Sequence, residues 1–134
     1  MNVFISHSES DADFVKQFAA ALTAQGFHVW QADREVLPGD NLWLKVGQAL
    51  EDADAMVVVL SRRAVVTASV RRDIEFALGS PQFRGRLVTL LLEDVDEIPW
   101  ALERLPVVRI ASRMPARAAK LVAAHLKLPR EKAG

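Results

Sequence analysis

The sequence predicts an α/β domain of the doubly wound, flavodoxin-like class, with five parallel strands in the order 2-1-3-4-5 and helices on both faces of the sheet. Three observations predict it. Short apolar segments rich in β-branched residues alternate along the chain with segments of helical periodicity. Ala55–Leu60 (AMVVVL) is apolar throughout, as in a central parallel strand that is covered on both faces. The length of 134 residues suits one domain with a single core.

The first strand and helix are predicted near the N-terminus. Val3–Ser6 is short, apolar and β-branched, so it is expected to be a buried strand. In the helix that follows, Ser10 is the expected N-cap and Gly26 the expected C-terminal stop. Its apolar side chains recur every four residues and form one stripe: Phe14, Phe18 and Leu22. Phe27–Trp30 is then the second strand.

The middle of the chain holds a long polar loop and two helices. Residues 32–41 (ADREVLPGDN) carry Pro38-Gly39 at the tip, and loops of this length are often functional. Leu42–Leu50 and Thr67–Leu78 have helical periodicity. Their expected inward side chains are Leu42, Val46 and Leu50 in the first helix, and Val70, Ile74, Ala77 and Leu78 in the second.

Two strands and a helix complete the domain. Leu87–Leu92 is the fourth strand, and Ile98–Leu102 is expected to form one helical turn. Pro106–Ile110 is an edge strand, because proline is tolerated at a strand's first position. A last helix, Ala116–Leu126, ends the domain near residue 128, and we expect residues 129–134 to be a flexible tail.

Composition excludes several classes of function. Seventeen basic and seventeen acidic residues give no net charge, which argues against nonspecific electrostatic binding to nucleic acid or to an anionic membrane. There is no cysteine, so thiolate catalysis and cysteine-ligated zinc are excluded. The three histidines lack metal-ligand spacing, and His125 is expected to face solvent. With no leader and no apolar run of membrane-spanning length, we expect a metal-free cytoplasmic protein.

The charges are unevenly distributed along the chain. Residues 1–60 hold nine acids and three bases, a net charge of −6, whereas residues 61–134 hold eight acids and fourteen bases, a net charge of +6. Six arginines gather in one part of the second half: Arg62, Arg63, Arg71, Arg72, Arg84 and Arg86. This asymmetry indicates head-to-tail contacts between copies of the chain, although arginines on a solvated face remain the alternative.

The predicted topology locates a candidate site. Doubly wound folds bind ligands beyond the carboxyl ends of their strands, where the strand order reverses. Residues 6–10, 32–41 and 61–69 fall there. Glycine-rich phosphate loops are absent, which argues against ordinary dinucleotide binding. Serines and a histidine stand where a phospho-acceptor domain needs clustered acids, so we reject that class too.

Four segments together resemble a Toll/interleukin receptor (TIR) domain of the bacterial kind, over roughly residues 2–128. They are VFISHS at 3–8, GFHVW at 26–30, LPGD at 37–40, and VVLS at 58–61 followed by VRRDIEFAL at 70–78. The resemblance implies a signalling or defence module that associates with itself and with other TIR domains. The expected contact is the family's BB loop, here Val36, Leu37, Pro38, Gly39 and Asp40. It also implies NAD⁺ as a substrate cleaved at the nicotinamide–ribose bond, with no permanently bound cofactor.

The resemblance identifies a catalytic candidate. The family's Trp-x-x-x-Glu pattern aligns with Ser69 and Asp73, and its carboxylate stabilises the positive charge that develops on the ribose. Aspartate reaches about 1.5 Å less far than glutamate, so we expect Asp73→Glu to raise activity by restoring the reach that the family uses. Glu75 is the alternative, but it lies roughly 200° around the helix from Asp73. The candidate substrate contacts are Ser6, His7, Ser8, Trp43, Ser61 and Ser69.

Two alternatives to a catalytic TIR domain stay open. The first is a weak or inactive TIR scaffold that acts only through protein–protein contacts, which the departures at Ser69 and Asp73 favour. The second is a nucleoside deoxyribosyltransferase-like enzyme, which shares the topology and a carboxylate. The Pro38-Gly39 loop argues against this second alternative.

Overall fold

The structure is a computed structural model that describes residues 1–31, 35–95, 98, 102, 105–110 and 113–128. Its core is a five-stranded sheet in the order β2-β1-β3-β4-β5, and every neighbouring pair of strands is parallel. The predicted fold class and strand order are therefore confirmed. The strands are β1 Asn2–Ser6, β2 His28–Val29, β3 Ala55–Leu60, β4 Leu87–Leu91 and β5 Val107–Arg109.

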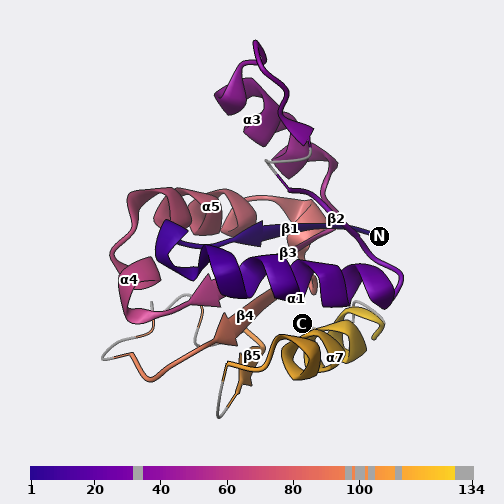
Figure 1. Cartoon of the computed structure of the whole chain (residues 1–134), viewed down its shortest axis with the longest axis vertical. Helices are drawn as coiled ribbons and strands as arrows, with labels where there is room; N and C mark the ends of the chain where they lie inside the picture. Colours follow the sequence, from indigo (N-terminus) through magenta and orange to yellow (C-terminus); the bar gives the residue numbers. More distant parts are fainter. Residues whose placement is uncertain (32–34, 96–97, 99–101, 103–104, 111–112, 129–134) are drawn as a thin grey trace.

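Helices cover both faces of this sheet (Figure 1). They are η1 Glu9–Asp11, α1 Ala12–Ala24, α3 Leu42–Asp52, α4 Arg62–Val65, α5 Ala68–Leu78, η2 Pro81–Phe83 and α7 Pro115–Leu126. Helices α1 and α7 pack on one face, and α5 packs on the other. Among the described residues, no helix is long and apolar enough to cross a membrane.

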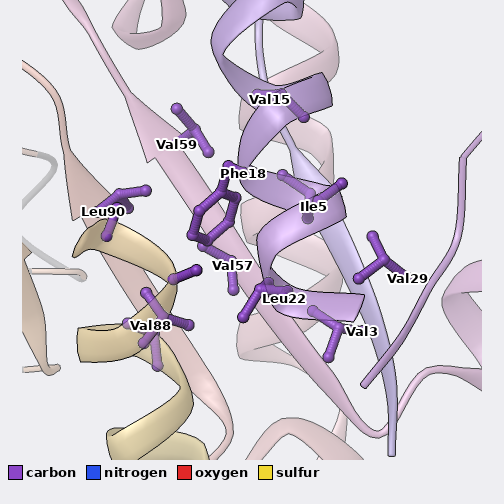
Figure 2. Close-up of a cluster of buried hydrophobic side chains, with 14 of the residues drawn as sticks. Val3, Ile5, Val15, Phe18, Leu22, Val29, Val57, Val59, Val88 and Leu90 are labelled. Atoms are coloured by element: carbon purple, nitrogen blue, oxygen red, sulfur yellow. The ribbon is translucent and has the colours of Figure 1, made fainter. Parts of the chain in front are cut away.

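The face beneath α1 carries the larger core. Phe18 and Leu22 of α1 are fully buried and point toward the valines of β3, as Figure 2 shows. Helix α1 ends as its sequence predicts. Gly26 has φ +99°, its N–H donates to the Thr23 carbonyl (3.0 Å), and the Phe27 N–H donates to the Leu22 carbonyl (3.3 Å).

Strand register fixes the end of the sheet where the candidate site lies. Val3 of β1 lies opposite Ala55 of β3, and Ser6 lies opposite Val58. Alternate side chains of β1 enter opposite cores, Ile5 on the α1 side and Phe4 on the α5 side. The predicted pairing of the first and third strands is therefore confirmed.

Three details of the helices differ from the sequence prediction. Ser10 caps no helix: Asp11 occupies the N-cap position of α1, and the Ser10 hydroxyl bonds that of Ser8 at 2.7 Å. Leu42 and Leu78 are 45% and 47% exposed rather than inward. Helix α3 extends away from the domain in Figure 1, and Leu50 near its end is its one buried residue.

The predicted tail at 129–134 and most of the predicted turn at 98–102 lie outside the described residues.

His125 of α7 is half-buried, contrary to the expectation that it faces solvent. Burial, with the nearby Arg86 charge, lowers the pKa of His125 below its ordinary value of 6.5. Its Nε2 is buried and has no hydrogen-bond partner among the described residues. The fold therefore favours the neutral imidazole.

His125 predicts a pH dependence of stability. A histidine whose pKa is lowered by folding binds protons more readily in the unfolded chain, so stability is complete above pH 6.5 and falls as the pH drops below it. We expect His125→Gln to flatten this fall. Urea midpoints of wild type and variant between pH 5 and 8 measure it; parallel curves over that range contradict it.

Candidate active site

Asp73 and Ser6 meet at the carboxyl end of β1. Asp73 lies on α5, on the flank of the buried stripe that includes Val70 and Ile74. The Ser6 hydroxyl donates a hydrogen bond to Asp73 Oδ2 at 2.7 Å. Ser6 is only 1% exposed, whereas Asp73 keeps part of its surface in contact with solvent. Two residues that are 67 positions apart in sequence thus form one unit at the strand end.

The surroundings of Asp73 shift its protonation in opposing directions. Burial is the largest influence and raises the pKa of Asp73 above its ordinary value of 3.8. The Ser6 hydrogen bond and the charges of Arg72 and His7 oppose this shift. A partly desolvated carboxylate interacts more strongly with a nearby cation than one in bulk water.

Trp43, at the start of α3, contacts an arginine of α5. The Arg72 guanidinium carbon lies 5.7 Å from the centre of the Trp43 ring, in cation–π contact. Trp43 is nonetheless 69% exposed. Arg72 precedes Asp73 on α5, and the contact leaves most of the Trp43 surface open to a ligand.

His7 lies on the α1 side of the same strand end. Its Nδ1 is 2.8 Å from the Ser8 carbonyl oxygen, which can only accept, so Nδ1 carries the proton of this bond. His7 also lines a groove of about 330 Å³ along α1. Trp30 and Gln31, which follow β2, form the opposite wall. The groove lies on the α1 face of the sheet, and neither Ser6 nor Asp73 lines it.

Ser8 and Ser61 face a different carboxylate, that of Asp11. The Ser61 hydroxyl donates to Asp11 Oδ2 at 2.6 Å, and the Ser8 hydroxyl donates to the same oxygen at 3.1 Å. Asp11 is only 3% exposed. This contact ties the turn after β1 to the turn after β3, so both serines contribute to the frame of the site.

Charged side chains extend this frame across the sheet. Asp11 Oδ1 accepts from Arg113 at 3.2 Å, and Arg113 also donates to Glu93 at 2.8 Å. Arg62 pairs with Glu93 at 3.3 Å. Signs alternate along this row, which follows the carboxyl edge of the strands. No sequence pattern indicates this row of charges, because Asp11 is indistinguishable from an ordinary acid in a first helical turn.

The remaining residues that the sequence predicts for the site or the interface are at least partly exposed to solvent. Ser69 is exposed one helical turn before Asp73, and Glu75 is exposed on the other flank of α5. In the loop, Asp40 accepts the Leu37 N–H at 2.8 Å and returns its own N–H to the Leu37 carbonyl at 3.0 Å. Gly39 completes that turn with φ +92°, a conformation that favours glycine. This turn presents 37–40 to solvent.

Comparison with known proteins identifies the family. Residues 3–123 match the TIR domain family. The chain belongs to this family. The TIR domain is 41% identical over 61 residues to the NAD(+) hydrolase PdTIR of Paracoccus denitrificans (strain Pd 1222), and 39% identical over 59 residues to the 2′ cyclic ADP-D-ribose synthase BtTIR of Bacteroides thetaiotaomicron. These matches cover 45% and 43% of this chain, but only 20% and 21% of the relatives. The chain thus spans about a fifth of the curated relatives it matches.

Solved structures agree on the fold. The TIR domain of a Toll-related receptor from Hydra magnipapillata superposes with a TM-score of 0.68 at 17% identity, covering 80% of this chain and 82% of that one. A TIR-STING receptor from C. gigas gives 0.77 at 20% identity, over 95% of this chain and 39% of that one. At these identities the likeness concerns the fold of the TIR domain alone.

Proposed function

We propose that this TIR domain cleaves NAD⁺ at the nicotinamide–ribose bond, with Asp73 as the carboxylate that faces the ribose. The observation that carries the proposal is the partly buried Asp73 carboxylate, held by Ser6 at the carboxyl end of the central strands. Open α/β sheets bind their ligands at this edge. Similarity to the NAD(+) hydrolase PdTIR and the 2′ cyclic ADP-D-ribose synthase BtTIR, which share about two fifths of the matched residues with this chain, supports it.

The proposed chemistry needs one anion and a water molecule. As the bond between ribose C1′ and the nicotinamide nitrogen breaks, its electron pair leaves with nicotinamide, which departs neutral. The ribose becomes oxocarbenium-like, and the Asp73 carboxylate stabilises its positive charge. Water then adds to C1′ and releases a proton to solvent. Trp43 offers an exposed ring face for stacking. The charge of His7 acts on Asp73, and we assign to His7 a contact with the substrate's phosphates.

The protonation of Asp73 predicts the acid limb of the reaction. Only the ionised carboxylate stabilises a cation, and burial raises the pKa of Asp73 above 3.8. We therefore expect kcat to fall on acidification at a pH above that value. A kcat–pH profile between pH 3.5 and 8 measures this limb. A flat profile down to pH 4, with the protein still folded, would contradict the assignment.

We also propose that the domain associates with itself through the loop tip and the start of α3. Apolar side chains gather there without cover in the described structure: Leu37, Leu42, Trp43 and Leu44. Exposed apolar patches of this kind mark interaction surfaces. The opposite net charges of the two halves of the sequence favour head-to-tail contacts, in which copies can form open filaments.

Trp43→Ala tests this association. Large aromatic side chains dominate interface energies, so we expect the dissociation constant to rise at least about tenfold. Added salt weakens the contact by screening charge. Sedimentation velocity measures both effects, with Leu121→Ser on the exposed face of α7 as the control. If the sedimentation of Trp43→Ala and wild type is the same over all concentrations, this surface is not the interface.

A further inference from the structure

We propose that Ser6 is a positioning residue for Asp73: its buried hydroxyl fixes one carboxylate oxygen and leaves the other for the substrate. This inference rests on the proposed function. The Ser6 hydroxyl donates to Asp73 Oδ2 at 2.7 Å. Within the described part of the chain, Oδ1 has no hydrogen-bond donor, so it is the oxygen that can face the ribose.

Ser6 is a rigid anchor. It ends β1, which pairs with β3 from Val3 to Ser6, and Ser6 itself lies opposite Val58. Its side chain is 1% exposed and has a single rotatable bond to its hydroxyl oxygen. A buried hydroxyl needs an acceptor, and Asp73 supplies it. The donor position is therefore set by the sheet.

Asp73 is held from the other side by the core. Val70, Ile74 and Ala77 bury α5 against the sheet, which fixes the Asp73 backbone relative to β1. The hydrogen bond then restricts the two side-chain torsions of Asp73. A carboxylate that is already oriented stabilises a developing cation without reorganising during the reaction.

The same bond preserves the reactive ionisation state. Burial raises the pKa of Asp73, and the Ser6 hydrogen bond is the largest influence that opposes it. A donor to a carboxylate favours the charged form. Without the Ser6 hydroxyl, Asp73 becomes neutral at a higher pH, in addition to losing its orientation.

The pair also explains why aspartate suits this position. The present geometry brings the short side chain to 2.7 Å from Ser6. A glutamate side chain is longer by about 1.5 Å, so its carboxylate extends beyond the position in which it accepts the Ser6 hydrogen bond. Reach alone predicts that Asp73→Glu raises activity, whereas positioning by Ser6 predicts that it lowers activity. The two accounts therefore differ in sign.

The test is Ser6→Ala, with an NMR titration of the Asp73 carboxyl carbon and steady-state kinetics on NAD⁺. We expect the Asp73 titration and the acid limb of kcat to move together to higher pH. We also expect kcat to fall about tenfold to a hundredfold while KM changes little. Ser6→Cys, which keeps the volume with a weaker donor, should shift both in the same direction by less. Thr89→Val, which removes a buried hydroxyl from β4, is the matched control and should leave both unchanged.

Two results would overturn the inference. One is an Asp73 titration that is identical in wild type and in a folded Ser6→Ala variant. The other is higher kcat in Asp73→Glu. Because the NMR titration needs no turnover, it separates the two proposals. If wild type releases no nicotinamide but Ser6→Ala shifts the titration, the proposed function fails while Ser6 still controls the state of Asp73.

Discussion

Asp73→Asn is expected to reduce nicotinamide release from NAD⁺ at least about a hundredfold, with the fold intact. Asparagine has nearly the same shape as aspartate, and its side-chain oxygen can still accept the Ser6 hydrogen bond at the end of β1. What it lacks is the negative charge that stabilises the ribosyl cation. Circular dichroism checks the fold, and chromatographic quantification of nicotinamide measures the reaction.

Glu75→Gln is the matched control. It removes one negative charge from the same helix, two residues away, on an exposed flank that does not face Ser6. We expect its turnover to remain within about twofold of wild type. If Glu75→Gln abolishes turnover and Asp73→Asn does not, the catalytic carboxylate is Glu75, and Asp73 serves only to accept the Ser6 hydroxyl.

Arg113→Met is expected to lower the free energy of unfolding by about 3 kcal/mol, because it leaves the buried Asp11 carboxylate without its charged partner. The value lies at the lower end for such pairs, since the Arg113 side chain is 45% exposed. The two serine hydroxyls that remain on Asp11 compensate only part of the lost charge. Urea denaturation measures the change.

A double-mutant cycle isolates the cause. Asp11→Asn keeps an oxygen for Ser8 and Ser61 but removes the buried charge, so it should restore part of the stability lost in Arg113→Met. Arg117→Met removes an exposed arginine from α7 and is expected to change stability by at most about 0.5 kcal/mol. Strictly additive effects of Asp11→Asn and Arg113→Met would show that the pair does not stabilise the fold.

The strands were predictable because their sequences carry the signal of their environment. The unbroken apolar run of β3 indicates that the strand is buried on both faces. Gly26 indicates the end of α1, because the positive φ that ends this helix favours glycine. Periodicity failed in α3, where Leu42 lies on the apolar stripe but is exposed. Periodicity identifies an apolar face, but it does not identify what covers it, and α3 contacts the domain mainly near Leu50.

The site was predictable only in outline. Topology places Ser6, Ser8 and Ser61 at the same edge of the sheet, as expected. The partners of these hydroxyls lie far away in the sequence: Ser61 and Asp11 are 50 positions apart, and Ser6 and Asp73 are 67 positions apart. Local sequence patterns do not reveal contacts over such separations. The sequence therefore does not identify Asp11 as the partner of Ser8 and Ser61. It also predicts that Ser6 contacts the substrate, whereas Ser6 contacts Asp73.

Nicotinamide release by the purified wild-type protein tests the central claim most directly. The protein is incubated with NAD⁺ over a range of protein concentrations, since association can be required for turnover, and nicotinamide and residual NAD⁺ are quantified together. Cleavage at the nicotinamide–ribose bond predicts one nicotinamide for each NAD⁺ consumed, at a rate that Asp73→Asn abolishes. Unchanged NAD⁺ at every protein concentration would contradict the account and leave the TIR domain as a scaffold.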